Sequence, residues 1–200
     1  MKEFIINGDI YTQVADFIRS KDGSTDTINP KKFINKFWDI STIPTDDSID
    51  NLISGNVTEI STTATTIKNH IFCYSENLVN IDMPNVVSIG ESAFEHCNNL
   101  ELTALPEGIT EIGRYAFQHC TKLALTSLPS TLTSIGDSAF NNCTSLTTIT
   151  FKGTPTTISS SAFENCTNLT TINVPWAEGE VANAPWGADN ATINYNYTSE

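Results

Sequence analysis

Cysteine and histidine are the side chains of this 200-residue chain whose spacing suggests chemistry. Four cysteines recur at nearly constant spacing, at Cys97, Cys120, Cys143 and Cys166, and Cys73 stands outside that series. If equivalent residues stack as in a β-ladder, their Cα atoms fall within the range of about 4.4 to 6.8 Å that a disulfide needs. Stacked equivalents point in the same direction, however, and not toward each other. We therefore predict reduced cysteines, buried in a column of small apolar groups.

A metal site is the second chemical possibility, because two of the cysteines directly follow a histidine. The pairs are His96-Cys97 and His119-Cys120, and two histidines with two cysteines form a zinc ligand set. Neighbouring residues leave the chain in different directions, so the four groups are not expected to converge, and the sequence has no Cys-x-x-Cys pair. We favour a stacked pair of surface histidines, and we predict no metal and no cofactor.

Catalysis has little support in the sequence. Serine, histidine and aspartate are present, but no motif places them together, and no glycine-rich phosphate loop or calcium loop occurs. Glu91, Arg114 and Asp137 take equivalent positions with alternating charge, which predicts a charge ladder of about 0.2–1 kcal/mol per pair. We predict that the protein is not an enzyme.

The charge balance limits the partners. The formal net charge is −13, although only 16% of the residues are charged. A uniformly acidic surface repels phosphate backbones, so we expect no nucleic acid partner. No stretch approaches the roughly 18 apolar residues of a membrane span, so we expect no membrane insertion. The first residues lack the apolar run of a signal peptide, which favours a virion, the cytoplasm or another export route.

An internal repeat must position all of these side chains. Five copies align on a small or apolar residue followed by phenylalanine, with steps of 22, 23, 23 and 23 between Phe72, Phe94, Phe117, Phe140 and Phe163. Columns of isoleucine, glycine, leucine and cysteine move in step with the phenylalanines. A period near 23 lies in the leucine-rich range of about 20 to 29 residues.

One repeat shows the predicted elements. A short strand opening at Leu123 is ended by Pro129, and a second extended run is closed by Gly136, where a turn can take a positive φ. Residues 137–142 are expected to form one helical or 3-10 turn that buries the alanine and phenylalanine. Stacking at about 4.8 Å per repeat joins the apolar columns into one core. The predicted fold is an α/β repeat solenoid, a right-handed stack of about five rungs.

The repeat motif reads Leu-x-x-Ile/Thr-x-Leu-Pro … Ile-x-x-Ile-Gly-x-x-Ala-Phe-x-x-Cys-x-x-Leu from about Ile67 to Val174. It resembles the BspA-like, or Treponema-type, leucine-rich repeats. The resemblance implies a surface or secreted binding and adhesion protein of bacteria or protozoa, and such repeats also occur in proteins of gut bacteria and their phages. The first copy departs from the motif, because Ser75 replaces the cysteine.

The two ends of the chain differ from the repeats at 51–168. Residues 169–200 are expected to cap the solenoid, with Trp176 and Trp186 covering the open core and residues 191–197 adding a strand. An exposed ligand-stacking platform is the alternative for both tryptophans. Residues 1–50 predict a helix-loop-helix module. Their run from Val14 to Phe33 is similar to segments of phage tail and virion-associated proteins.

The outward side of the first strand of each repeat is the candidate binding surface. Its residues are Asn80, Asp82, Leu102, Ala104, Leu125, Ser127, Thr148, Thr150, Thr171 and Asn173. Leu102 and Leu125 have two possible positions. They form an exposed apolar patch, or a shifted strand register buries them. We favour the shifted register.

These features together predict a non-catalytic interaction module. The first hypothesis is surface recognition or adhesion, in which the strand side binds a protein or a glycan. The alternative is a structural phage tail or virion component with residues 1–50 as its assembly element.

Overall fold

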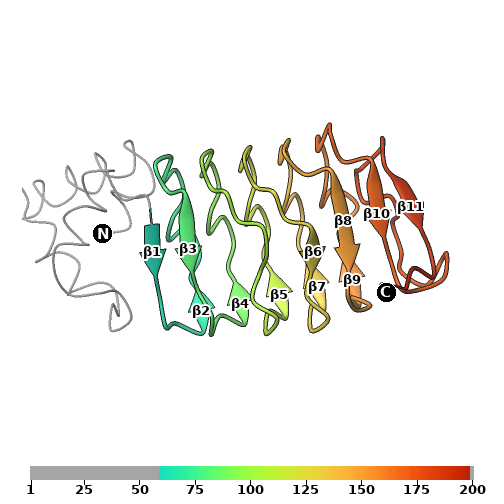
Figure 1. Ribbon diagram of the computed structural model, residues 1–200, viewed down its shortest axis with the longest axis horizontal. Helices are drawn as coiled ribbons and strands as arrows, with labels where there is room; N and C mark the ends of the chain where they lie inside the picture. The colour runs from blue at the N-terminus through green and yellow to red at the C-terminus, as the bar shows by residue number, and fades with distance from the viewer. Residues whose placement is uncertain (1–58, 199–200) are drawn as a thin grey trace, which may run out of the picture.

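A computed structural model describes residues 59–198 as a parallel β-solenoid. The strands lie in order along the long axis, from β1 at one end to β11 at the other (Figure 1). The eleven strands of the described residues are β1 (Glu59–Ser61), β2 (Thr66–Ile67), β3 (Asn80–Asp82), β4 (Ser88–Ile89), β5 (Glu111–Ile112), β6 (Ser127–Leu128), β7 (Ser134–Ile135), β8 (Thr148–Phe151), β9 (Thr157–Ile158), β10 (Thr171–Asn173) and β11 (Thr192–Asn194).

Two rows of parallel strands run along the solenoid. One row is a continuous five-stranded sheet, β2-β4-β5-β7-β9, in which the inward isoleucines of successive repeats are in register. The other row is split into a two-stranded sheet, β1-β3, and a four-stranded sheet, β6-β8-β10-β11. This second row holds six strands in two groups, so the predicted stack of about five rungs is confirmed and extended at its ends.

The core lies between the strand rows and the segments that carry the phenylalanines. The five phenylalanine rings are all buried and stack along the solenoid axis, with centroids of successive rings 5.3, 5.2, 5.4 and 5.1 Å apart. Successive ring planes are inclined by at most 16°. The apolar columns predicted from the repeat therefore form one continuous core.

We call the residues from the glycine column to the cysteine column, for example 90–97, the Ala-Phe segment of a repeat. The prediction gave this segment a helical or 3-10 turn, whereas the described residues contain no helix. Ser92 and His96 have φ values of 51° and 59°, which interrupt any right-handed helix. Their N–H groups donate to the carbonyls of Arg114 and Gln118 in the next repeat, both at 2.8 Å. Stacking therefore replaces internal helical bonds with bonds between repeats.

The glycine column has a different cause from the one predicted. Gly136 does not have a positive φ, because the glycines with positive φ in the described residues are Gly179 and Gly187. A Cβ on Gly136 would instead lie 2.6 Å from the backbone nitrogen of Arg114. Glycine is required here because neighbouring backbones approach each other closely.

The C-terminal end closes the core as predicted. Trp176 and Trp186 are only 3% and 0% exposed, and both rings pack against Phe151. The Nε1–H of Trp186 donates to the carbonyl of Ala182 at 2.7 Å. Burial excludes the alternative of an exposed stacking platform. The predicted last strand is β11, which pairs in register with β10.

Candidate binding surface

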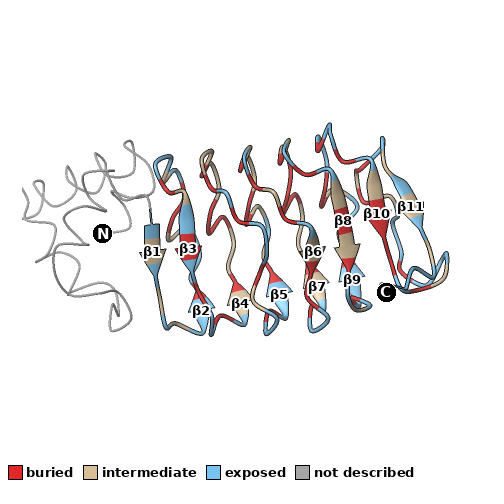
Figure 2. Ribbon diagram, in the orientation of Figure 1, coloured by how far each residue is buried: buried red, intermediate tan, exposed pale blue. Residues whose placement is uncertain are grey.

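The predicted binding surface follows the split strand row. Its first part, which we call the N-terminal strand face, carries the exposed residues Asn80 and Asp82 of β3 beside Glu59 and Ser61 of β1. Figure 2 shows these two strands with exposed positions on either side of their central residue. The Ser61 hydroxyl donates to the Asp82 carboxylate at 3.3 Å. This face is small, polar and acidic.

The second part is larger, and we call it the C-terminal strand face. It consists of the outward residues of the four-stranded sheet: Ser127, Thr148, Thr150, Thr171, Asn173, Thr192 and Asn194. Five of these were predicted from the sequence. Thr192 and Asn194 were missed, although the alternation over residues 191–197 had indicated a strand that could join the same sheet.

Hydrogen bonds between side chains order part of the C-terminal strand face. The amide of Asn194 donates to Asn173 Oδ1 at 2.8 Å, and the amide of Asn173 donates to Thr150 Oγ1 at 3.1 Å. These residues are paired across β11, β10 and β8. Asn173 is buried, at 7% exposed, and Thr148, Thr171 and Thr192 form the adjacent, more accessible threonine column.

Leu102 and Leu125 belong to the core and not to the binding surface. They are 6% and 1% exposed, so the burial that we favoured for them is confirmed, although β6 pairs with β8 at the usual offset of the repeat. Burial of Leu102 leaves two successive exposed residues, Thr103 and Ala104, and a strand whose side chains alternate cannot accommodate that pattern. The repeat therefore has no strand at this point, and Ala104 stays exposed between the two sheets.

The two strand faces differ in charge. The outward strand residues of the C-terminal strand face carry no charged group, whereas the N-terminal strand face carries Glu59 and Asp82. Lys152, which directly follows β8, is in an ion pair in which its Nζ contacts Glu107 Oε1. An acidic protein thus presents one flat surface of hydroxyl and amide groups.

The two histidines are partly exposed, whereas the cysteines that follow them are buried. The rings of His96 and His119 stack with centroids 4.3 Å apart, and the ring of Tyr74 stacks on His96 at 4.4 Å. Burial and the neighbouring His96 lower the pKa of His119. Cys97 and Cys120 are fully buried in the core, so the possible zinc set of two histidines and two cysteines is not brought together.

The four regularly spaced cysteines have a structural role that the sequence did not reveal. Each Sγ donates to the carbonyl of the phenylalanine in the preceding repeat, for example Cys120 to Phe94 at 3.0 Å. The equivalent bonds of the other three cysteines are 2.9 to 3.1 Å long. Burial raises the pKa of Cys120 well above the ordinary value. The predicted buried column is therefore confirmed, and its thiols are hydrogen-bond donors.

The predicted charge ladder is formed at one of its steps. Arg114 Nε lies 3.3 Å from Asp137 Oδ2, and both side chains are about half exposed. Asp137 also accepts hydrogen bonds from Ser161 and Ser159, which together with Arg114 lower the pKa of its carboxyl group. Exposed pairs of this kind contribute little to stability.

Comparison with known proteins identifies the repeat. Residues 65–183 match the BspA type leucine rich repeat region, in six copies. The chain belongs to this family. A search of curated proteins finds none that matches this chain. The resemblance noted for residues 14–33 falls outside both the matched and the described residues, as does the predicted helix-loop-helix module, and both stay predictions.

A solved structure shares the leucine-rich-repeat architecture. The crystal structure of the T. pallidum leucine-rich-repeat protein is similar, with a TM-score of 0.54 and 24% identity over 71% of this chain and 72% of that one. A leucine-rich-repeat protein of Bacteroides ovatus matches with a TM-score of 0.45 and 27% identity, over 55% of this chain and 35% of that one. Between residues 59 and 198 the family member has no long apolar helix of the membrane-spanning type.

Proposed function

We propose that this leucine-rich-repeat protein is a non-catalytic recognition module that binds a polar protein or glycan surface through the C-terminal strand face. The observation that carries the proposal is the uncharged character of this face in a protein of net charge −13. The centres of protein interfaces are depleted of charged residues, because desolvating a charge is costly. A surface of hydroxyl and amide groups can exchange its water for a ligand at a lower cost.

The rigidity of the sheet supports the same proposal. Parallel pairing in register fixes the spacing of Thr148, Thr171 and Thr192, and the core beneath them is closed by buried aromatic rings. A surface that is ordered before binding loses little conformational entropy when a partner docks. The threonine hydroxyls both donate and accept hydrogen bonds, which suits the hydroxyl and amide groups of glycans and of polar protein surfaces.

The test compares charged substitutions on the two strand rows. The full chain and the double variant Thr148→Lys/Thr171→Lys are applied to an array of immobilised glycans and to a displayed-peptide library. The matched control is Thr66→Lys/Thr157→Lys, which places the same charges on exposed threonines of the continuous five-stranded sheet. We expect the first double variant to lose at least tenfold in affinity and the control to bind as the wild type does.

Equal loss in both double variants, or in neither, contradicts the proposal, since binding would then depend on net charge or on another surface. The alternative function as a phage tail or virion component depends on residues 1–50. Those residues lie outside the described part of the chain, and that function stays a prediction.

A further inference from the structure

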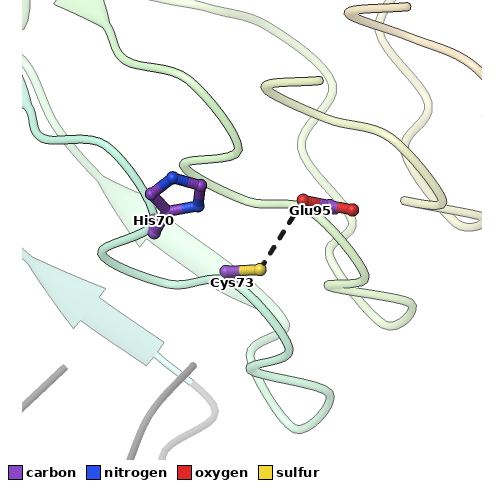
Figure 3. Close-up of side chains that lie close together, drawn as sticks. All are labelled: His70, Cys73 and Glu95. Carbon is purple, nitrogen blue, oxygen red and sulfur yellow. Dashed lines mark hydrogen bonds between the residues drawn. The ribbon is translucent and has the colours of Figure 1, made fainter. Parts of the chain in front are cut away.

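Three side chains with metal-binding atoms meet near the N-terminal end of the described solenoid. His70, Cys73 and Glu95 each offer one ligand atom, and these atoms all lie within 4.8 Å of one another. Figure 3 shows the imidazole and the thiol on one repeat, facing the carboxylate of the next. The Cys73 thiol donates to Glu95 Oε2 over 3.8 Å, a long contact between a weak donor and a strong acceptor.

Equivalent positions elsewhere in the solenoid show what is unusual here. Cys73 and Glu95 occupy the same column of the repeat, as Asn141 and Glu164 do further along. The Asn141 amide donates to the Glu164 carboxylate at 3.0 Å, so that pair is satisfied by an ordinary hydrogen bond. The first pair replaces this amide with a buried thiol, and His70 supplies an imidazole beside it.

Cys73 has no part in the structural task of the other cysteines. Those four thiols donate to phenylalanine carbonyls, and their column is occupied in the first repeat by Ser75. Cys73 is nevertheless 3% exposed, and its thiol faces the Glu95 carboxylate. A cation between the thiol and the carboxylate would offset both the burial and the repulsion of two anionic ligands.

We propose that His70, Cys73 and Glu95 bind a zinc ion. Thiolate, imidazole and carboxylate are the three ligand types that zinc takes in proteins. Zinc–ligand bonds of about 2.0 to 2.3 Å place tetrahedral ligand atoms roughly 3.3 to 3.8 Å apart, so the cluster must contract by about 1 Å. His70 is exposed, and rotation of its side chain can supply that movement. On binding, the Cys73 S–H proton is released to solvent and the sulfur bonds to the metal.

One oxygen of the carboxylate faces the thiol, and the exposed His70 leaves the site open to solvent on one side. Glu95 Oε1 lies 4.0 Å from His96 Nε2, while its other oxygen faces Cys73. Three protein ligands with a water in the fourth position form an open zinc site, so the site remains accessible to solvent on the side of His70. The ion would join the first two Ala-Phe segments by bonds between repeats.

The experiment uses the full chain, with Zn²⁺ titrated in competition with a chromophoric chelator and with Co²⁺ as a spectroscopic probe. We expect one ion per chain at micromolar affinity or tighter. Bound Co²⁺ should show the near-ultraviolet charge-transfer absorption of a thiolate ligand. His70→Ala and Cys73→Ser should each weaken binding at least tenfold, and Cys73→Ser should abolish the charge-transfer absorption.

Three variants serve as matched controls. His119→Ala removes a histidine of the stacked pair, Cys143→Ser changes a buried thiol of the regular column, and Glu164→Gln changes the equivalent carboxylate. All three should bind as the wild type does. Because His70 is exposed, His70→Ala keeps the core intact and tests the site even where Cys73→Ser fails to fold. Absence of stoichiometric binding, or binding unchanged in His70→Ala and Cys73→Ser, overturns the proposal.

Discussion

The Ala-Phe segments and the split strand row are built from the same repeats, but of these two regions only the Ala-Phe segments are continuous. On the Ala-Phe side, stacked rings run from Phe72 to Phe163 without a break, and thiols and backbone N–H groups bond from repeat to repeat. The strand row is interrupted where Leu102 and Leu125 turn inward. The Ala-Phe segments are therefore continuous because their side chains contact the next repeat, whereas the outward side chains of the strand row need not do so.

The difference shows where the sequence is free to vary. On the Ala-Phe side most repeats carry a flat ring, a small thiol donor and a glycine, because each of these contacts a neighbouring repeat. The strand side needs only an inward apolar residue, which backbone pairing then holds in place. Its outward residues change along the row, from Asn80 and Asp82 in β3 to threonines in β8 and β10, and that freedom is what a recognition surface requires.

The largest predicted effect tests the continuous side. Phe117→Ala removes a fully buried ring that stacks on both Phe94 and Phe140, which leaves a cavity in the middle of the column. We expect the free energy of unfolding to fall by about 3–5 kcal/mol. Urea unfolding of the full chain measures the change, with the exposed strand-side substitution Thr126→Ala, expected within about 0.5 kcal/mol, as control. A loss below about 1 kcal/mol for Phe117→Ala would mean that the column is not what holds the repeats together.

The second prediction asks whether one residue position breaks the strand row. Leu102→Thr alone removes apolar volume and buries a hydroxyl group in the core, and it should cost about 2–4 kcal/mol. Adding Thr103→Ile restores the apolar residue at the position that Ile81 and Ile149 occupy in regular strands. We expect the double variant to recover most of the loss, in a double-mutant cycle followed by urea unfolding.

A crystal structure of the double variant sharpens this result. We expect a regular strand at residues 102–104 that joins the two sheets into one. Additive losses in the cycle, or an unchanged gap between the sheets, would show that the break is imposed from elsewhere in the fold. Thr126→Ile, which acts on the same column without changing Leu125, is the matched comparison.

Much of this fold could be predicted from the sequence, because the same residue types recur at equivalent positions in successive repeats. The period, the inward residues and the closing role of Trp176 and Trp186 follow from residue types and spacing alone. The shape of the Ala-Phe segment could not be predicted in this way. The same spacing suits either a helical turn or a segment with two residues of positive φ. Hydrogen bonds to the carbonyls of the next repeat decide between them, and the linear pattern does not show those bonds.

The candidate sites were predicted less completely for a related reason. Side chains of different repeats meet only when the repeats are aligned column by column. Such an alignment places Cys73 in the column of Glu95, and it places Thr192 in the column of Thr171. The choice between an exposed and a buried Leu102 depended on the energy of burying leucine instead of the adjacent threonine, about 1.5–3 kcal/mol.

The smallest predicted effect is on the pH dependence of stability, compared between a buried thiol on the Ala-Phe side and an exposed thiol on the strand side. Cys120 keeps its proton in the folded protein well above the ordinary pKa of 9.0, because burial disfavours the thiolate and the thiol donates to the Phe94 carbonyl. In the unfolded chain the same thiol ionises near the ordinary value. The stability that Cys120 contributes is therefore complete below pH 9 and is lost as the pH rises above it, by about 1.4 kcal/mol per pH unit. The loss continues until the folded pKa is reached.

Urea unfolding at pH 7 and pH 10 under reducing conditions isolates this contribution. We expect Cys120→Ser to lose about 1.4 kcal/mol less than the wild type between the two pH values, because its hydroxyl does not ionise in either state.

Thr126→Cys is the counterpart on the strand side, where an exposed thiol has a similar pKa before and after unfolding and should leave the pH dependence unchanged. Identical losses in the wild type and Cys120→Ser would show that the thiol column is open to solvent. A larger loss in Thr126→Cys would show instead that the strand side buries its outward residues. Since all other titrating groups are common to the three proteins, the differences between them report only the thiol and the side of the solenoid on which it lies.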